Sequence, residues 1–388
     1  MSEKLRIGLV GLGTYAEIAH LPTYLNSPYA ADVELAAICD LNESRLNEIG
    51  DKHGIAGRYT DLNKMLAEAN LDAVSIVTPD HAHTAVVNMS LAAGLDVMVE
   101  KPLAQTVKDC DEMIRAARAA KRRLHTDFHK RCDPCHQEAR ARLFEGHYGQ
   151  VQAGFVWMQD RICIPAGGFF KTDLAAKSSP VWFLAVHFYD LLRFLTGLEP
   201  VEVRAVGHRQ VLAKRGIPTW DSVKADFIFT GGATMSFLVA WHLPDTLPNF
   251  TKQGVYLQCT EGELTIDTMN RGYYEVTPKE YRCINPMYTR RTPAGVQGYA
   301  HESIGEALRE FKRLKDAGEK RDALYETLEK DDPTTLDGLV ATLMAQATHL
   351  SLDEGENLGD GQVRIGAPVK LKDLLADHLG PAAKAYPF

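Results

Sequence analysis

The chain of 388 residues lacks several features that mark particular classes of protein. Acidic residues outnumber basic ones by 51 to 43, so the net charge is −8 and no basic surface for nucleic acid or anionic membrane is expected. No apolar run approaches the ~20 residues of a membrane span, and the chain enters its first predicted strand without a signal peptide. We therefore expect no nucleic acid or membrane partner, and a cytoplasmic location.

Cysteine is also sparse and follows no disulfide pattern. The seven cysteines are scattered and odd in number, which favours a reducing compartment. Cys132 and Cys135 have the spacing of half a zinc site, but no second pair of ligands stands at a matching spacing. We interpret this pair as chance proximity at a helix start and predict no metal site.

The first stretch of the chain carries the most specific pattern. An apolar run over residues 5–10 breaks into glycines and then begins a helix, which predicts a strand, a tight turn and a helix N-terminus that can hold a pyrophosphate. The first glycine allows the turn, the second lets the backbone approach the phosphates, and the small alanine keeps the helix close to the strand. The residues expected to hold a dinucleotide here are Gly11, Gly13, Thr14, Tyr15 and Ala16.

An acidic residue at the end of the second predicted strand, residues 33–40, strengthens this interpretation. Asp40 can accept hydrogen bonds from ribose hydroxyls and would repel a 2′-phosphate, so we predict NAD as the cofactor, with NADP less favoured. The spacing from the glycines is somewhat longer than the roughly 20 residues usual for this fingerprint. Alternatively, Asp40 caps the helix beginning near Asn42, and both roles can hold in one loop.

The next segments continue the alternation of strands and helices typical of an α/β domain. Strands are predicted at 72–79 and 96–100, and helices at 43–53, 62–69, 83–93 and 107–120. Because ligands bind outside the carboxyl ends of strands in an open α/β sheet, Thr78, Pro79 and His83 should border the nicotinamide half of the site. Lys101 follows the strand at 96–100 and is placed for chemistry, although a solvated lysine is an equal alternative.

Three segments together resemble the Gfo/Idh/MocA oxidoreductases. They are Gly8–Ala16, Thr78-Pro79 with His83, and Glu100-Lys101-Pro102. The resemblance implies a Rossmann domain, then a domain with a large open sheet, a bound nicotinamide cofactor, and redox chemistry at a secondary alcohol of a sugar or cyclitol. It also implies that Glu100 and Lys101 border the cofactor, and that the protein is a homodimer or homotetramer.

Residues 124–131 form a strand-like run that ends in a cationic cluster. The family commonly has Asn-x-Arg where the chain crosses between its domains, and His129 and Arg131 are similar to that pair. We expect His129 to contact cofactor and substrate and Arg131 to contact substrate. The alternative is a basic helix start on the surface, which the positive end of a helix dipole disfavours.

Beyond residue 151 the sequence changes to alternating strands. Strands are predicted at 151–158, 200–207, 221–230, 233–241, 254–259 and 262–267, which favours one broad, mostly antiparallel sheet. We predict an α/β Rossmann domain over 1–126 and an α+β domain over 127–388. Helices predicted at 303–315 and 336–354 cover that sheet or pack back on the first domain.

A second chemical locus is predicted on a helix over residues 181–196, with Gly197 as its stop. The family typically carries an aspartate four residues before the histidine and a glycine two before it, but this chain has Phe183 and Ala185 there. His187 and Asp190 both match. At Phe183 the chain therefore departs from the family's usual set of lysine, aspartate and histidine.

These residues predict a dehydrogenase mechanism. His187 takes the hydroxyl proton, Lys101 hydrogen-bonds the same oxygen, and Asp190 sets the protonation of His187 or binds substrate. The alternative for His187 is a satisfied histidine on an apolar helix. Two other functions stay open: a redox-neutral enzyme that recycles tightly bound NAD, and a non-catalytic NAD-binding sensor.

The loop over residues 161–171 joins the two loci. Arg161, Lys171 and, a few residues further on, Lys177 are candidates to clamp a carboxylate or phosphate, which predicts an acidic sugar as substrate. A solvated basic loop is the competing interpretation.

Overall fold

The computed structural model describes residues 3–169, 172–267, 273–276, 281–284, 289–292, 295–330, 334–358 and 361–386. The chain folds into two compact units. The first comprises Met1–Ala104, Lys108–Cys132 and Arg290–Leu339, and the second comprises Gln105–Val107, Asp133–Thr289 and Val340–Phe388. The first unit thus gathers a late segment of the chain in addition to most of residues 1–126.

The first unit contains the predicted Rossmann sheet. Six parallel strands stand in the order β3-β2-β1-β4-β5-β6, so the order reverses between β1 and β4, where such sheets bind ligands. β4, β5 and β6 are buried along their whole length, as parallel strands covered on both faces should be. The strands are Leu5–Val10, Val33–Cys39, Gly57–Tyr59, Ala73–Ile76, Asp96–Glu100 and Leu124–Asp127, numbered β1 to β6.

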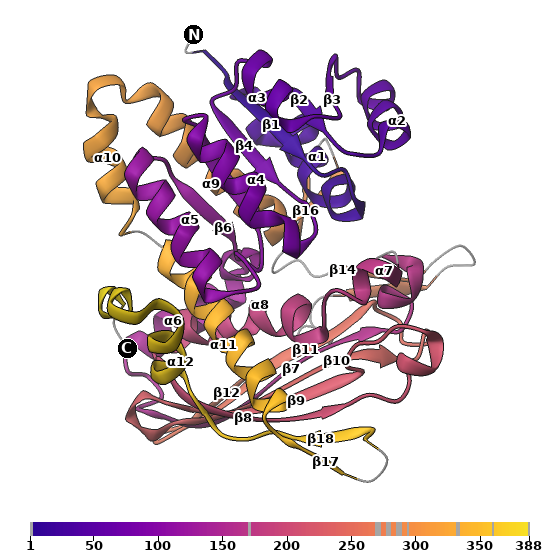
Figure 1. Ribbon diagram of the computed structural model, residues 1–388, viewed down its shortest axis with the longest axis vertical. Helices are drawn as coiled ribbons and strands as arrows, with labels where there is room; N and C mark the ends of the chain where they lie inside the picture. The colour runs from indigo at the N-terminus through magenta and orange to yellow at the C-terminus, as the bar shows by residue number, and fades with distance from the viewer. Residues whose placement is uncertain are drawn as a thin grey trace. The chain divides into compact units, whose positions relative to one another are not determined.

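Helices accompany these strands in the expected order (Figure 1). The side chain of Asn42 caps α2 by accepting a hydrogen bond from the backbone N–H of Arg45, and Gly54 ends that helix in the left-handed conformation. The helices are α2 (Glu43–His53), α3 (Leu62–Glu68), α4 (His83–Ala92) and α5 (Val107–Ala120).

The helix after the glycine turn is not the regular α-helix that the sequence predicts. A π-turn, Ala16–His20, precedes the short helix α1, Leu21–Asn26. Pro22 has no N–H to donate to the preceding turn, and a widened turn at this point accommodates the missing hydrogen bond.

A late helix completes the hydrophobic core of the first unit. Helix α9, Tyr299–Asp316, buries Ile304, Leu308 and Phe311 in one cluster with Ile7 and Leu9 of β1. Of the two arrangements expected for this helix, the structure has the one in which it packs on the nucleotide-binding sheet. Helix α10, Arg321–Leu328, follows it, and α11 covers Thr335–Asp353.

The second unit is built on a nine-stranded mixed sheet. Its order is β12-β11-β7-β10-β9-β8-β18-β17, with β19 also pairing with β8; β7 and β10 are parallel, and the other pairs described are antiparallel. The strands are β7 (Val151–Arg161), β8 (Pro200–His208), β9 (Ser222–Phe229), β10 (Thr234–Leu243), β11 (Thr251–Cys259), β12 (Glu263–Asp267), β17 (Glu356–Leu358), β18 (Val363–Ile365) and β19 (Val369–Lys370).

Helices of the same unit lie over one face of this sheet (Figure 1). They include α6 (Pro134–Phe144), α8 (Val186–Thr196) and α12 (Leu371–Leu379). The short helix α7 (Thr172–Ala175) precedes α8 in the sequence. The other face exposes large apolar side chains such as Phe155 and Ile228, which are 37% and 43% exposed. Along β9 buried and exposed residues alternate strictly, as expected for a sheet covered on one side.

Two short strand pairs complete the described chain: β13 (Tyr273–Val276) with β14 (Tyr281–Ile284), and β15 (Thr289–Thr292) with β16 (Gly295–Gly298). Among the described residues, no helix has both the length and the apolar character needed to cross a membrane.

Candidate functional site

The glycine turn has the geometry that a dinucleotide requires. Gly11 adopts a φ of +89°, and a Cβ at this position would lie 2.5 Å from the carbonyl oxygen of Val77. Gly13 is different, because a Cβ there would meet no atom within 4 Å, and both Gly13 and Thr14 are exposed. Ala16, by contrast, is fully buried against the sheet. The turn is therefore tight on its inner side and open where backbone N–H groups face outward.

Asp40 connects the glycine turn to the next loop. Its Oδ2 accepts a hydrogen bond from the backbone N–H of Leu12 at 2.8 Å, and its Oδ1 accepts one from the N–H of Asn42, also at 2.8 Å. Asn42, not Asp40, is the N-cap of α2. The alternative in which Asp40 caps that helix is thus replaced by a role in bracing two loops, and the half-buried carboxylate keeps lone pairs for a further donor.

Tyr15 and His129 lie together at the carboxyl edge of the sheet. The hydroxyl of Tyr15 and Nδ1 of His129 are 3.1 Å apart, and the ring of Tyr299 lies 5.3 Å from that of His129. Lys130 places its ammonium 5.8 Å from the Tyr299 ring centre. Burial, with the charges of neighbouring carboxyls, raises the pKa of Tyr15 well above its usual value, so its hydroxyl stays protonated.

His83 links the two loops that follow β4 and β5. It is fully buried, with Nε2 3.0 Å from the carbonyl oxygen of Thr78 and Nδ1 2.8 Å from that of Pro102. Burial lowers its pKa, so a neutral ring donates to one of the two carbonyls at a time. These contacts show that His83 supports the two loops and does not lie at the exposed edge of a ligand site. Pro79 is exposed. The Lys101-Pro102 peptide bond is cis.

The hydroxyl of Thr78 is free for a ligand. Its Oγ1 is buried and makes no hydrogen bond to any described residue. Because a buried hydroxyl is normally satisfied, this atom marks a place where a bound group would complete the bonding. Together with the open space at Gly13, it shows that the residues present fit a dinucleotide.

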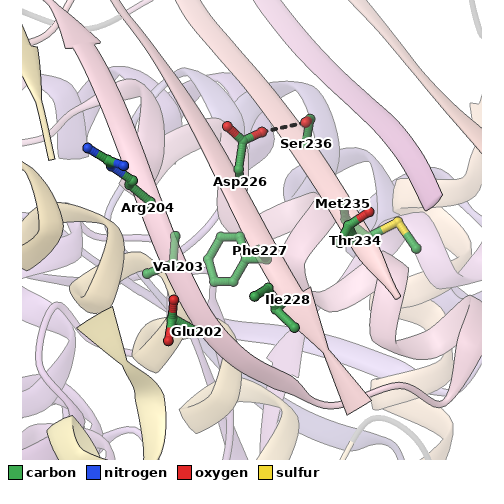
Figure 2. Close-up of a pocket in the computed structure, with 9 residues that line it drawn as sticks. All are labelled: Glu202, Val203, Arg204, Asp226, Phe227, Ile228, Thr234, Met235 and Ser236. Carbon is green, nitrogen blue, oxygen red and sulfur yellow. Dashed lines mark hydrogen bonds between the residues drawn. The ribbon is translucent and has the colours of Figure 1, made fainter. Parts of the chain in front are cut away.

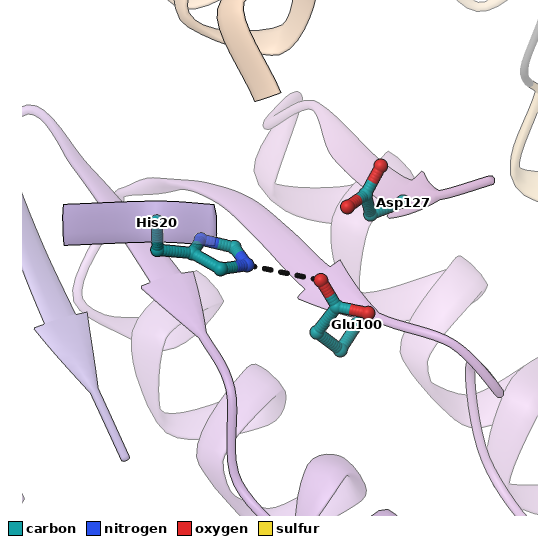
Figure 3. Close-up of side chains that lie close together, drawn as sticks. All are labelled: His20, Glu100 and Asp127. Atoms are coloured by element: carbon teal, nitrogen blue, oxygen red, sulfur yellow. Dashed lines mark hydrogen bonds and ion pairs between the residues drawn. The ribbon is translucent and has the colours of Figure 1, made fainter. Parts of the chain in front are cut away.

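Next to Lys101, which is itself 8% exposed, lies a buried cluster that the sequence did not predict. His20, Glu100 and Asp127 each offer one ligand atom, and these atoms lie within 4.8 Å of one another (Figure 3). Nε2 of His20 is 2.9 Å from Oε1 of Glu100. Oδ1 of Asp127 accepts a short hydrogen bond from the hydroxyl of Ser303 on α9.

Burial shifts the pKa values in this cluster strongly. It raises the pKa of Glu100 to about 7 and that of Asp127, with the added charge of Glu100, to about 8. It lowers the pKa of His20 to about 4. No sequence pattern indicated this cluster, because His20 lies in an apolar helical segment and Ser303 comes from a distant part of the chain.

Arg131 has structural partners. It is 6% exposed, its Nη2 lies 3.3 Å from Oδ2 of Asp337, and its guanidinium lies 5.8 Å from the ring of Phe128. Asp337 also accepts a hydrogen bond from the backbone N–H of Thr334 at 2.8 Å. These contacts tie the end of the sheet to the start of α11, so any contact of Arg131 with substrate stays a proposal.

In the second unit, His187 and Asp190 stand on α8, where the sequence placed them. Both are buried, at 5% and 0% exposure, and Gly197 ends the helix in the left-handed conformation as predicted. The segment before them, Val181–Ala185, is a π-turn rather than the regular helix expected from residue 181. It begins just after Pro180, which stands at its N-cap.

Phe183, at the position of the family's aspartate, belongs to an aromatic cluster. Its ring centre lies 6.1 Å from that of Phe169 and 5.7 Å from that of Trp241. Phe183 thus fills its position by apolar packing.

The cationic residues expected to clamp an acid are differently placed. The guanidinium of Arg161 lies over the ring of Phe250 at 4.9 Å, and its Nε is 3.6 Å from Oδ1 of Asp245. Lys171 lies outside the described residues. Arg161 is therefore already engaged by an aromatic ring and a carboxylate.

A hollow of about 310 Å³ lies elsewhere, on strands β8, β9 and β10 (Figure 2). Asp226 and Ser236 hydrogen-bond across neighbouring strands at its rim, and Lys224 binds the same carboxylate at 2.5 Å. Its lining contains none of the residues predicted for cofactor or catalysis.

The reversed parallel sheet, the glycine turn and Asp40 together define a dinucleotide-binding α/β protein with a second, sheet-based domain. The chain matches the family described as "Oxidoreductase family, NAD-binding Rossmann fold" over residues 5–128, and the GFO/IDH/MocA C-terminal domain over residues 136–265. The chain therefore belongs to the Gfo/Idh/MocA oxidoreductase family, and its cofactor is NAD, as predicted.

Curated relatives share less than a third of their residues with the chain. It is 29% identical over 201 residues to D-glucoside 3-dehydrogenase of Escherichia coli, covering 52% of this chain and 56% of the relative. It is 31% identical over 222 residues to UDP-N-acetylglucosamine 3-dehydrogenase of Acidithiobacillus ferrooxidans, covering 55% and 62%. The match thus spans little more than half the length of these relatives.

Solved structures confirm the fold over nearly the whole chain. An inositol dehydrogenase homolog of Azotobacter vinelandii, complexed with NADH and myo-inositol, has a TM-score of 0.75 at 18% identity and covers 95% of this chain and 98% of its own. Scyllo-inositol dehydrogenase of Lactobacillus casei has a TM-score of 0.71 at 18% identity, covering 95% and 99%.

Proposed function

We propose that the protein is an NAD-dependent dehydrogenase that oxidises a secondary hydroxyl of a sugar, cyclitol or sugar acid. The observation that carries the proposal is the carboxyl edge of the first sheet, where the open glycine turn, the free Thr78 hydroxyl and Lys101 belong to one unit. The names of the relatives, which are dehydrogenases and a reductase of sugars and inositols, support the same substrate class.

When bound, NAD would supply the acceptor for the hydride of the carbinol carbon. The exposed backbone N–H groups that follow Leu12 in the turn would hold the pyrophosphate, and Asp40 would accept hydrogen bonds from the adenosine ribose. Thr78, Pro79, Glu100 and His129 would border the nicotinamide half, and His83 supports the loops on which Thr78 and Pro102 lie.

The chain's own groups handle one proton and one developing charge. His187 takes the proton of the substrate hydroxyl as general base, while the Lys101 ammonium hydrogen-bonds the same oxygen and stabilises the alkoxide. Asp190, one helical turn after His187, sets its protonation or binds substrate.

Two variants test these roles. Lys101→Met and His187→Asn should each lower kcat/KM by about a hundredfold or more, the range for loss of acid-base or charge-stabilising groups, while NADH still binds. NADH formation should be measured with NAD and NADP against polyols, aldoses, uronates and glycosides. Wild-type kcat/KM in His187→Asn on the preferred substrate would contradict its assignment.

The substrate panel also addresses the acid clamp of Arg161, Lys171 and Lys177. Arg161 is engaged by Phe250 and Asp245. The net cationic character of the loop supports an acidic substrate. If the clamp binds an acidic group, kcat/KM should be higher for uronates than for neutral polyols. A clearly higher kcat/KM for polyols would contradict the clamp.

The panel distinguishes the two alternatives as well. Stoichiometric NAD with product formed but no free NADH would favour a redox-neutral enzyme that recycles bound NAD. Bound NAD without turnover on any compound would favour a sensor, which the apolar packing of Phe183 supports.

We also propose a cytoplasmic homo-oligomer, a dimer or tetramer. The open face of the nine-stranded sheet, with exposed Phe155 and Ile228, supports burial against a second copy. Light scattering should give a multiple of the monomer mass, and Ile228→Asp should reduce it; a monomeric wild type would contradict the proposal.

A further inference from the structure

The buried cluster beside Lys101 contains two carboxyl groups, and its surroundings cannot stabilise both of them in the ionised form. Glu100 is 6% exposed and Asp127 and His20 are fully buried. They come from three elements, the ends of β5 and β6 and the π-turn after the glycine loop, and converge on one point (Figure 3). Two adjacent buried carboxylates would each lack solvation and repel the other.

The contacts of His20 favour one arrangement of the protons. Nδ1 of His20 lies 2.9 Å from the Tyr24 hydroxyl and 3.1 Å from that of Ser75, both able to donate to it. His20 is then neutral with its proton on Nε2, which donates to Glu100 at 2.9 Å. Glu100 is accordingly the acceptor, and the backbone N–H of Lys101 donates to it as well.

Asp127 has one oxygen bound and one without a partner. Oδ1 accepts from the Ser303 hydroxyl, while Oδ2 is buried and has no conventional donor among the described residues. A proton on Oδ2 would satisfy that atom by donating to Glu100, the neighbouring carboxylate. Such a proton would make the two groups an acid and its conjugate base joined by one hydrogen bond.

We propose that Asp127 and Glu100 share one proton, and that the pair positions Lys101. Asp127 holds the proton and donates to Glu100, and Glu100 in turn holds the Lys101 backbone and places a single negative charge beside its ammonium. The positioning of Lys101 matters for catalysis only if Lys101 has the role given under the proposed function. The shared proton does not depend on that role.

The pKa values agree with this assignment. Burial raises both carboxyl pKa values, and the hydrogen bond between the two lowers that of Glu100 and raises that of Asp127, which is the order expected if Asp127 is the donor. The groups that interact electrostatically with the pair are Tyr15, His20, Tyr24, Asp80, Lys101 and Cys132. Lys101 favours ionisation of Glu100, and Asp80 opposes it.

The same three side chains could instead hold a divalent metal ion. A metal would require both carboxylates ionised and the Nε2 lone pair of His20 aimed at the ion. The direct contact between Nε2 and Oε1, with two hydroxyls facing Nδ1, favours the proton. Metal content is therefore an outcome of the test.

Infrared difference spectroscopy of the full chain tests the shared proton without any turnover. At neutral pH the wild type should show the carbonyl stretch of a protonated carboxyl, which disappears as the pH rises through the pKa of Asp127. Asp127→Asn, whose amide can still donate to Glu100 and accept from Ser303, should lack that band. Asp111→Asn removes another buried carboxyl, on α5, and should keep it.

Two further variants keep the test decisive if Asp127→Asn fails to fold. Ser303→Ala removes a hydrogen bond that favours ionised Asp127, so the band should persist to higher pH. Glu100→Gln removes a charge that, in addition to burial, raises the pKa of Asp127, so the band should be lost at lower pH than in the wild type. Identical spectra in wild type and Asp127→Asn, or one divalent metal ion per wild-type chain, would overturn the shared proton.

The positioning role has its own readout. If the pair positions Lys101, the alkaline limb of kcat/KM in the wild type should move to higher pH in Asp127→Asn, because asparagine cannot ionise. An unmoved limb alongside a lost infrared band would overturn the positioning role and leave the shared proton standing. Absence of turnover with the band present would count against the proposed function instead.

Discussion

At the scale of single residues, Gly11 and Gly13 make opposite demands although they stand two positions apart. A methyl group on Gly11 would press on the Val77 carbonyl and would be strained by the positive φ of this position, whereas one on Gly13 would meet open space. Gly11→Ala should therefore lower the free energy of unfolding by about 1–3 kcal/mol. Thermal unfolding of both variants measures this, with Gly13→Ala as the matched control.

Gly13→Ala should change cofactor affinity rather than stability. Its stability should match the wild type, but the Cβ would occupy the space through which the backbone approaches a pyrophosphate, so NADH affinity should fall about tenfold or more. Fluorescence titration with NADH measures the affinity. Unchanged affinity in a folded Gly13→Ala protein would show that the open space serves no ligand.

Asp40 carries the predicted choice between NAD and NADP. Asp40→Ala removes two hydrogen bonds to backbone N–H groups and the charge that opposes a 2′-phosphate. The ratio of kcat/KM for NADP over NAD should rise about tenfold or more, given the strength of hydrogen bonds to charged groups. Asn42→Ala, which removes only the cap of α2, should leave that ratio unchanged; an unchanged ratio in Asp40→Ala would contradict the role of the carboxylate.

At the scale of elements, the π-turn before α8 carries an aromatic side chain, Phe183, which packs against other aromatic rings. Phe183→Asp restores the family's usual residue but places a carboxylate against Phe169 and Trp241. Because Phe183 is half-buried, we expect a loss of about 1–3 kcal/mol in unfolding free energy, less than for a fully buried Phe, and no gain in kcat/KM. Phe183→Leu should cost less. A rise in kcat/KM for Phe183→Asp would mean that the family's catalytic set is intact but for this residue.

Strands and helices with a clear period were predictable from sequence. The strand Asp96–Glu100 and the helix Val107–Ala120 have the predicted bounds, because each combines a strong apolar pattern with a clear stop. The π-turns at Ala16–His20 and Val181–Ala185 were not predictable from a period of 3.6. The edge strands β17 to β19 are only two or three residues long, too short to show alternation.

The candidate site was predictable where one local segment carries the chemistry. Gly11, Asp40 and Lys101 each follow a strand, and strand ends meet at one edge of a parallel sheet. The Asp127–Ser303 contact joins residues 176 positions apart, and no local pattern relates them. The partners of Arg131 and Arg161 were likewise hidden, since Asp337 and Phe250 are distant in sequence.

At the scale of the whole molecule, the buried cluster makes stability depend on pH. The pKa values of Glu100 and Asp127 are raised to about 7 and 8, so the folded state binds protons more tightly than the unfolded one and loses stability as pH rises towards 8. His20, lowered from 6.5 to about 4, acts oppositely, but only below 6.5. Between pH 6.5 and 8 the free energy of unfolding should therefore fall.

Denaturant unfolding across that range measures the effect. Asp127→Asn should flatten the fall, since asparagine does not titrate, and Asp111→Asn should retain it. Stability that rises from pH 6.5 to 8 in the wild type, in the absence of other titrations, would contradict the assignment of the buried protons.

The most direct test of the central claim follows the hydride. Purified protein with NAD is incubated with polyols and sugars deuterated at their carbinol carbons, and the released cofactor is examined by mass spectrometry. The proposed dehydrogenase should place deuterium on the reduced cofactor, with the transfer lost in Lys101→Met and His187→Asn. A protein that binds NAD but never yields deuterated NADH across the panel would contradict the proposed oxidation.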